Sequence, residues 1–174
     1  MSYSPLPQLE TARPRLRRPD DRDTEAAIAY LGSDRSRLVG GPTDRGTAWR
    51  AHAGMVGHWT LRGFGMVTVT LKTDGAIIGQ VGCYFPCDWP ERELGWHIWS
   101  PVHEGCGLAF EAALAVRDHA FGRLGWPTAV SYIDPANARS IALAVRLGAR
   151  LDSAALAPEP GGALVFRHSR PEGF

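Results

Sequence analysis

A glycine-bearing segment ahead of an alanine-rich stretch is the first place where the sequence could bind a ligand. In "PVHEGCGLAFEAAL", residues 101–114, Gly105 and Gly107 flank Cys106 directly before a predicted helix. Glycine lets the backbone approach a ligand closely, and the first turn of a helix presents N–H groups that have no partner within the helix. Together with the helix dipole, these groups favour a phosphate or pyrophosphate. A tight turn from strand to helix would explain the same glycines without a ligand.

The spacing and the first residue of this segment narrow the choice of ligand. The spacing matches neither G-x-x-x-x-G-K-[ST] nor G-x-G-x-x-G, the motifs that usually indicate a bound nucleoside triphosphate or dinucleotide. The segment also begins with an acid, Glu104. A carboxylate that points toward a bound pyrophosphate would repel it, whereas one that points outward would have little effect.

Cysteine and histidine side chains suggest two further kinds of site, a zinc site and a thiol-dependent hydrolase site, and the sequence favours neither. Cys83, Cys87, His97 and His103 could be combined into a zinc site. The two cysteines straddle a predicted strand end and no second pair has ligand spacing, so no metal is expected. Cys106 could serve as a nucleophile at a helix N-terminus, but a thiol-dependent hydrolase also needs a positioned histidine, and His103 lies in an unsuitable loop.

Composition and charge describe one folded domain. The 174 residues are 44% hydrophobic and 21% charged, which suffices for a packed core. The net charge of +1 disfavours nucleic acid as a partner, and the basic run at 13–18 is typical of a strand with a solvated face. The sequence shows no apolar signal region and no run of about 18 apolar residues, so no membrane partner is expected. The odd number of cysteines, three, fits a reducing cytoplasm.

Changes in hydrophobic period predict the elements that position these residues. The predicted helices are 20–32, 47–61, 107–123 and 138–147. The predicted strands are 9–16, 65–72, 77–85, 92–99, 129–133, 151–156 and 164–168. The fold class is therefore α/β, with a mixed, mostly antiparallel central sheet of about six to seven strands and about four flanking helices. We expect a single domain over residues 9–168, a flexible segment at 1–8 and a C-terminal tail at 169–174.

Several motifs in consistent order resemble the acetyl-CoA-binding core of the GNAT N-acetyltransferases, most closely the RimJ/RimL-type branch. The segments "LETARPRLRRPDDRD" and "WPERELGWHI" resemble the opening and the W-P-x-x-E-x-G-W strand of that branch. The remaining correspondences are to its glycine loop, its long helix and its D-P-x-N-x-x-S motif: Glu104, Gly107, Ala109, Glu111, Ala112, His119, Ala120, Phe121, Asp134, Pro135, Asn137 and Ser140. The resemblance covers about residues 8–168.

This resemblance implies acetyl-CoA as co-substrate. Backbone N–H groups of residues 104–109 would hold the pyrophosphate. The pantetheine arm would lie in a splay between the strands near 92–99 and 129–133. Asn137 would touch that arm, although asparagine ahead of a helix is also a good N-cap. The implied CoA-binding residues are Trp96, His97, Ile98, Trp99, Glu104, Gly105, Cys106, Gly107, Leu108, Ala109, Asn137 and Ser140.

Acetyl transfer to an amine requires a base, because an alkyl amine with a pKa of about 10.4 is protonated at neutral pH. The candidate base is Glu93, a lone carboxylate in an otherwise apolar strand, which the related branch uses through an ordered water. The alternative is a solvent-facing residue paired with Arg92 or Arg62. A backbone N–H of residues 96–98 would donate to the thioester oxygen.

The acid that protonates the leaving thiolate is less well defined. The tyrosine that many GNAT enzymes use corresponds to Ala144 here. Ser140, as in RimL-like members, is then the hydroxyl that would hold the sulfur or relay a proton through water. A second hypothesis is a GNAT-fold protein that binds acyl-CoA as a sensor with weak or no catalysis. It is favoured by Ala144, by Glu104 and by Ala149, which replaces the usual phenylalanine.

The expected function is transfer of an acetyl group from acetyl-CoA to a primary amine by direct attack. The acceptor would be a protein N-terminus or a small-molecule amine, and a homodimer is left open by the sequence. The N-terminal helices and their loop would set the acceptor, with candidates Asp44, Trp49, His52, His58 and Arg62. Tryptophans would also line its site, although core packing is the commoner role for each: Trp49, Trp59, Trp89, Trp96 and Trp99.

Overall fold

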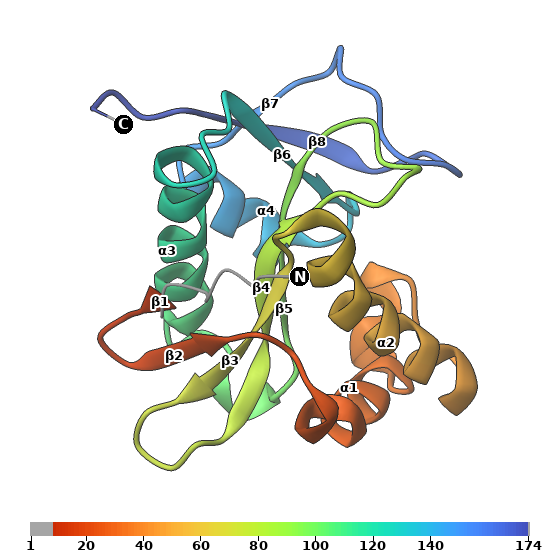
Figure 1. Cartoon of the computed structure of the whole chain (residues 1–174). Coiled ribbons are helices and arrows are strands. Elements are labelled where there is room, and N and C mark those ends of the chain that lie inside the picture. Colours follow the sequence, from red (N-terminus) through yellow and green to blue (C-terminus); the bar gives the residue numbers. More distant parts are fainter. Residues whose placement is uncertain (1–8, 174) are drawn as a thin grey trace.

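The computed structural model describes residues 9–173, so the predicted flexible segment at 1–8 lies outside the described residues. The centre of the described chain is one sheet with the strand order β1-β2-β3-β4-β5-β6-β8-β7 (Figure 1). Neighbouring strands are antiparallel except β5 and β6, which are parallel. The strands are β1 Leu9–Glu10, β2 Pro14–Arg17, β3 Met66–Leu71, β4 Ile77–Tyr84, β5 Glu93–Ile98, β6 Thr128–Ile133, β7 Arg150–Leu151 and β8 Leu164–Ser169. The mixed, mostly antiparallel α/β fold is confirmed, and the two-residue strands β1 and β7 bring the sheet to eight strands.

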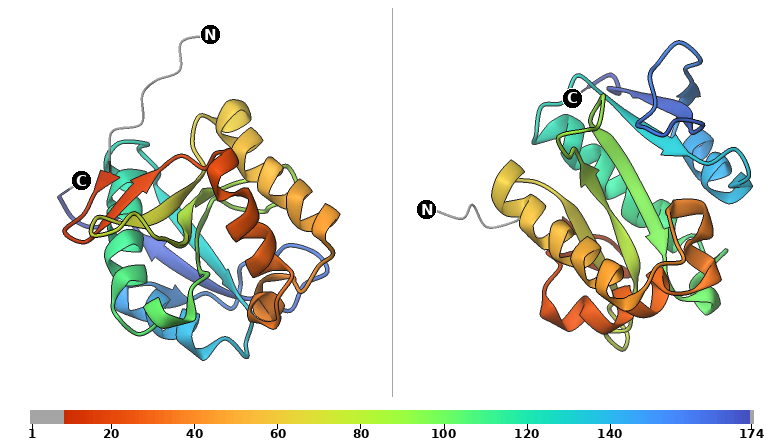
Figure 2. Two further views of the ribbon diagram at one scale, coloured as in Figure 1. Left: turned by 90° about the horizontal axis from the view of Figure 1, so that it is seen from below. Right: turned by 90° about the vertical axis from the view of Figure 1, so that its right-hand side faces the viewer.

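Helices cover both faces of this sheet. Over residues 9–173 the α-helices are α1 Thr24–Leu31, α2 Arg45–Arg62, α3 Leu108–Gly122 and α4 Ala138–Arg146. Short 3-10 helices, η1 Asp21–Asp23, η2 Asp34–Val39 and η3 Pro101–His103, lie between the regular elements. Figures 1 and 2 show α1 and α2 side by side on one face and α3 on the other, with α4 beneath β6 and β8. None of the helices in this part of the chain combines the length and the apolar character that crossing a membrane requires.

Two predicted strands are shorter than expected because side chains end them early. The chain turns between β1 and β2, where the Thr11 hydroxyl donates to the Pro14 carbonyl at 2.7 Å, so the single strand predicted at 9–16 is wrong. The strand predicted at 151–156 is also wrong beyond Leu151. There the Asp152 carboxylate accepts from the Ala154 N–H at 3.2 Å and from Arg167 Nε at 2.6 Å, which turns the backbone out of the sheet.

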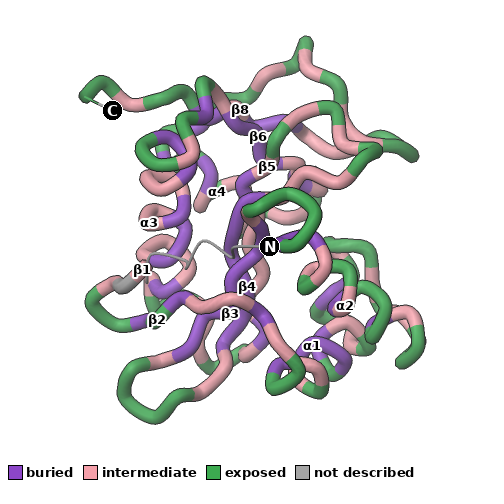
Figure 3. The backbone as a smooth tube through the Cα atoms, in the orientation of Figure 1, coloured by how far each residue is buried: buried purple, intermediate pink, exposed green. Residues whose placement is uncertain are grey.

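The main core lies between the sheet and α3. Val69, Ile78, Val81 and Phe121 have no exposed surface, and Figure 3 shows buried backbone along β3, β4 and the inner side of α3. On the opposite face, Tyr30 of α1 stacks on the ring of Trp99 at a centroid distance of 6.0 Å. The two packed faces hold the sheet rigidly between its helices.

A buried carboxylate attaches the start of α1 to the sheet. Asp23 is fully buried, and its carboxylate accepts from Arg17 Nη2 at 2.5 Å and from the Thr68 hydroxyl at 2.7 Å. It also accepts from the backbone N–H of Asp20 at 3.1 Å, and the Asp20 carboxylate in turn caps η1. One side chain therefore joins β2, β3 and the helical N-terminus, and we call Arg17, Asp20, Asp23 and Thr68 the Asp23 anchor.

Candidate functional site

β5 and β6 pair at one point and then diverge. Glu93 faces Val130 in the parallel register, and the Val130 N–H donates to the Arg92 carbonyl at 2.9 Å. The next β5 carbonyl on that side, that of Leu94, accepts from the Ser131 hydroxyl at 2.6 Å. A side chain thus replaces a main-chain ladder bond where the strands separate. The splay predicted between residues 92–99 and 129–133 is confirmed.

The splay leaves main-chain N–H groups of β5 without a neighbouring strand. Trp99 N–H donates to the Ile78 carbonyl of β4 at 2.7 Å. Because ladder bonds alternate along an antiparallel strand, the N–H of His97 also faces β4, whereas those of Trp96 and Ile98 face the splay. Of the three backbone donors considered from the sequence, the register therefore favours Trp96 and Ile98 over His97.

The glycine loop has the backbone that the sequence predicts. Gly105 and Gly107 have φ of 72° and 77°, a left-handed conformation that other residues adopt only with strain. Gly107 is the N-cap of α3 and supplies no side chain, and the first intrahelical bond recorded is from the Glu111 N–H to the Gly107 carbonyl at 3.1 Å. The N–H groups of the first turn, residues 108–110, therefore have no helical partner. The Glu104 N–H donates to the Pro101 carbonyl at 3.3 Å, and its contribution to a pyrophosphate site stays a prediction.

Arg13 supports this loop from the turn before β2. Its Nη1 donates to the Cys106 carbonyl at 2.8 Å, and its Nε donates to the Glu111 carboxylate at 2.7 Å. Cys106 is exposed and free. The loop is consequently fixed through a carbonyl, while the N–H groups at the start of α3 stay open.

The Glu104 side chain bridges two arginines from distant elements. Its carboxylate accepts from Arg35 of η2 at 2.5 Å and forms an ion pair with Arg139 of α4. Arg35 also donates to the carbonyls of Ile98 and Trp99 at the end of β5. The negative charge of this carboxylate is thus matched by two cations.

Replacement of Glu104 by Gln should strengthen CoA binding about two- to fivefold, because it removes a negative charge and releases Arg139 while Arg35 keeps its carbonyl contacts. The gain should be larger at 20 mM than at 500 mM salt, since screening shortens the reach of these exposed charges. Isothermal titration with CoA measures the effect. The double variant Glu104→Gln/Arg139→Ala is the control and should lose most of the gain. Weaker binding by Glu104→Gln would mean that the carboxylate organises the loop.

A pocket of about 350 Å³ lies where the splay meets the α1–α2 layer. Elements from both halves of the chain line it, and it brings together these predicted site residues: Glu93, Trp96, His97, Trp99, Asn137 and Ser140. Ile98 and the loop residues 104–109 are not among its lining residues, so the loop and the pocket are separate parts of the site. Of the predicted acceptor residues and tryptophans, it includes His52, Trp89, Trp96 and Trp99.

Glu93 is one of two acids that line this pocket, together with Asp134. Its carboxylate accepts from Trp89 Nε1 at 2.6 Å and from the backbone N–H of Tyr132, which the splay has freed from the ladder. Burial raises the pKa of Glu93 to about 7, although these two hydrogen bonds act in the opposite direction. No ion pair of Glu93 is recorded among the described residues, so the alternative pairing with Arg92 or Arg62 is wrong. A carboxyl group that titrates near neutrality without a cation is suited to proton transfer.

Asn137 and Ser140 hold the start of α4 beside the splay. Asn137 Oδ1 accepts from the Ser140 N–H at 3.1 Å, so its N-cap role is confirmed. The Ser140 hydroxyl accepts from Trp96 Nε1 at 3.2 Å, which ties α4 to β5. Both residues also line the pocket. The hydroxyl keeps its own hydrogen for a further acceptor.

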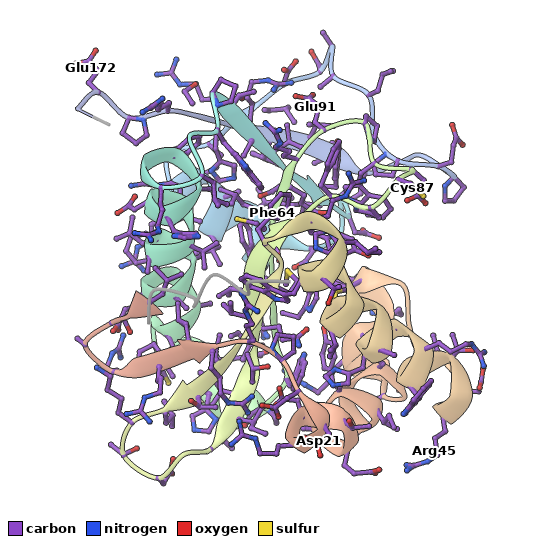
Figure 4. All side chains as sticks on the ribbon, in the orientation of Figure 1. Asp21, Arg45, Phe64, Cys87, Glu91 and Glu172 are labelled. Carbon is purple, nitrogen blue, oxygen red and sulfur yellow. The ribbon has the colours of Figure 1, made fainter. Side chains whose placement is uncertain are left out.

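The structure separates the residues considered for other chemistries. Cys83 is buried, whereas Cys87 is exposed, and Figure 4 shows Cys87 on the outer end of the β4–β5 connection. Within residues 9–173, no group of three or more histidine, cysteine or acidic side chains is placed to hold a metal ion. The tryptophan Trp49 is 54% exposed, and Trp59 lies in the core with its Nε1 donating to the Met66 carbonyl.

The sequence interpretation missed pocket residues that belong to no motif. Tyr30, Met66, Gln80, Tyr84 and Tyr132 line the pocket. The pairing register of β4 and β5 identifies two of them. Gln80 lies opposite His97 and Tyr84 opposite Glu93, so their side chains share a face of the sheet. Predicting these residues requires the register between the two strands, and the alternation of apolar and polar residues in the sequence does not determine that register.

The mixed sheet opens at one splayed parallel pair, and a glycine turn precedes the helix that follows β5. This is the arrangement that the resemblance to acetyltransferases implies. The model of the acetyltransferase (GNAT) domain family matches residues 13–150. The chain belongs to the GNAT family.

Solved structures agree with this assignment. An acetyltransferase from Agrobacterium tumefaciens strain C58 is 39% identical over 97% of both chains, with a TM-score of 0.88. A putative ribosomal-protein-serine acetyltransferase from Vibrio cholerae is 21% identical, with a TM-score of 0.73 over 95% of this chain and 99% of that one. An aminoglycoside acetyltransferase, AAC(6')-Ib, in complex with coenzyme A is 16% identical, with a TM-score of 0.74 over 90% and 95% of the two chains. The last two likenesses concern the fold alone.

Proposed function

We propose that this protein transfers the acetyl group of acetyl-CoA to a primary amine, with Glu93 as the base. The observation that carries the proposal is the Glu93 carboxylate, which lies in a pocket beside the splay without a cationic partner among the described residues. Membership of the GNAT family supports acetyl transfer in general. The free thiols of Cys83, Cys87 and Cys106 support a reducing compartment such as the cytoplasm.

The residues present fit acetyl-CoA. The left-handed glycines Gly105 and Gly107 leave the N–H groups of residues 108–110 open for the pyrophosphate. The splay offers the N–H groups of Trp96 and Ile98 to an extended arm, and Asn137 lies at the same opening. A solved relative in fold was obtained with coenzyme A bound, which supports the same ligand here.

Acetyl-CoA would supply a thioester: the amine nitrogen bonds to its carbonyl carbon, the carbon–sulfur bond breaks, and CoA leaves as a thiolate that takes a proton from water. Glu93, as the carboxylate, takes the proton from the amine directly or through water. The N–H groups of Trp96 and Ile98 stabilise negative charge on the carbonyl oxygen. The Ser140 hydroxyl donates a hydrogen bond to the sulfur as charge develops on it. Tyr132 and Trp89 hold the carboxylate in place through their N–H groups.

Acetyl-CoA should raise the melting temperature by roughly 5–10 °C at a hundredfold excess over its dissociation constant, because it binds the folded state only. Differential scanning fluorimetry measures the shift, with free acetate and thiol as controls. No shift at millimolar acetyl-CoA would contradict the proposal.

Thiol release then separates an enzyme from a protein that only binds acyl-CoA. An enzyme should release CoA thiol in the presence of an acceptor amine, at a rate that saturates with the amine. Binding without release from a broad panel of amines would instead support a sensor.

A further inference from the structure

The part of the pocket formed by α1, η2 and α2 is apolar. Leu31, Leu38, Val39 and Met55 line this wall, and the ring of Tyr30 completes it. Tyr84 and Trp89 add aromatic rings beside Glu93, with a centroid distance of 5.5 Å between them. A ligand body in contact with this wall is bound by shape and desolvation, which favours an aromatic or aliphatic body.

The charges that line the pocket are few. The lining includes no lysine or arginine, and its acids are Glu93 and Asp134, the residue that directly follows β6. His97 is neutral at pH 7 because burial lowers its pKa to about 4. A ligand carboxylate would therefore meet no cation, and a second ammonium group placed against the wall of Leu31, Leu38, Val39 and Met55 would meet no acid. Both cost free energy.

Three residues that line the pocket carry a buried polar atom that has no partner among the described residues. The side-chain nitrogens Gln80 Nε2 and Trp99 Nε1 are buried donors without an acceptor, and Gln80 is only 3% exposed. His52 Nε2 donates to the Asp20 carbonyl at 3.0 Å, which leaves its buried Nδ1 as an unused acceptor. Buried polar atoms normally have partners, and a neutral oxygen group on a ligand would supply the acceptor that the Gln80 and Trp99 donors lack.

We propose that the acceptor is a small primary amine on an aromatic body with one neutral oxygen group, such as a ring hydroxyl. The amine lies at Glu93, the ring contacts the wall of Tyr30, Leu31 and Leu38, and the oxygen reaches the donors Gln80 and Trp99. The inference rests on the proposed function and names the substrate class of the same site. Polyamines and aminosugars fail because they bring further ammonium groups, and a peptide N-terminus fails because its amides exceed the partners available.

The first test compares amines directly. We expect tyramine to give a kcat/KM for CoA thiol release at least about tenfold above those of spermidine, kanamycin and an octapeptide with a free N-terminus. A higher kcat/KM for any of these three overturns the proposed class and leaves the acetyltransferase function intact. Absence of release with all four amines, while acetyl-CoA still raises the melting temperature, contradicts the proposed function itself.

The second test changes the apolar wall of the pocket so that it should prefer diamines to tyramine. Leu38→Glu places a carboxylate in the apolar wall, at a partly buried residue outside the core clusters. We expect kcat/KM to fall about tenfold for tyramine and to rise about tenfold for the best of a series of diamines with three to eight carbons, because the second ammonium group gains a partner. The matched control is Leu156→Glu, at a residue that is 74% exposed and does not line the pocket. This control should keep the wild-type preference. An unchanged preference in folded, CoA-binding Leu38→Glu overturns the proposal.

Discussion

Glu93→Gln should lower kcat about 10²- to 10³-fold, because glutamine cannot take the proton from the attacking amine. The substitution keeps an acceptor for Trp89 Nε1, so the fold and the affinity for acetyl-CoA should change little. Stopped-flow measurement of thiol release gives kcat, and titration calorimetry gives the CoA affinity. The matched control is Asp88→Asn, an exposed carboxylate of the same β4–β5 connection that does not line the pocket.

The pH profile provides a second signature of Glu93. Burial raises the pKa of this carboxyl group to about 7, so the reactive carboxylate form accumulates as the pH rises through neutrality. For the wild type, kcat/KM should therefore rise through a step near pH 7, below the rise caused by the acceptor amine itself. Glu93→Gln should lose that step and keep the later rise. Unchanged turnover, or a step that persists in the variant, would remove Glu93 from the mechanism.

Asp23→Ala should lower the free energy of unfolding by about 3–5 kcal/mol, the second large effect that the structure predicts. The carboxylate of the Asp23 anchor is fully buried, and its removal leaves Arg17 without its closest acceptor and the Thr68 hydroxyl without its partner. At 2–4 °C per kcal/mol for a chain of this size, the melting temperature should fall by roughly 10 °C. Urea denaturation with a fluorescence readout measures the change.

The control for Asp23 is its neighbour in the same 3-10 helix. Asp21 is exposed and lies two residues earlier, so Asp21→Ala should change the free energy of unfolding by less than about 0.5 kcal/mol. Equal effects of the two substitutions would show that the anchor does not hold α1 to the sheet. Because α1 supplies Tyr30 and Leu31 to the pocket, a destabilised anchor should also weaken acceptor binding.

Local features of the sequence predicted the parts of the site that depend on local backbone. Gly105 and Gly107 stand where the chain has positive φ, and Asn137 caps the helix that follows it. These outcomes follow from residues within a few positions of one another, which is the range over which propensity acts. The order of strands and helices was predictable for the same reason, apart from the early ends of two strands.

Features that depend on distant partners were not predictable. Glu104 appeared as an unfavourable charge because Arg35 and Arg139, its partners, lie on η2 and α4. Asp23 lies within the helix predicted at 20–32, and its burial depends on partners from β2 and β3. The apolar wall of the pocket likewise follows from how α1, η2 and α2 pack, which one sequence does not show.

The divergence of β5 from β6 gives this protein an edge in the interior of its sheet. Exposed edges invite another chain to pair with them, and most proteins cover or interrupt them. Here α4 lies beside that edge, tied to β5 by the hydrogen bond from Trp96 Nε1 to the Ser140 hydroxyl. A thin ligand whose amide groups follow a strand-like spacing can complete the hydrogen bonds that β6 leaves unmade. Selectivity for such an arm then depends on the unpaired main-chain groups of β5 as much as on any side chain.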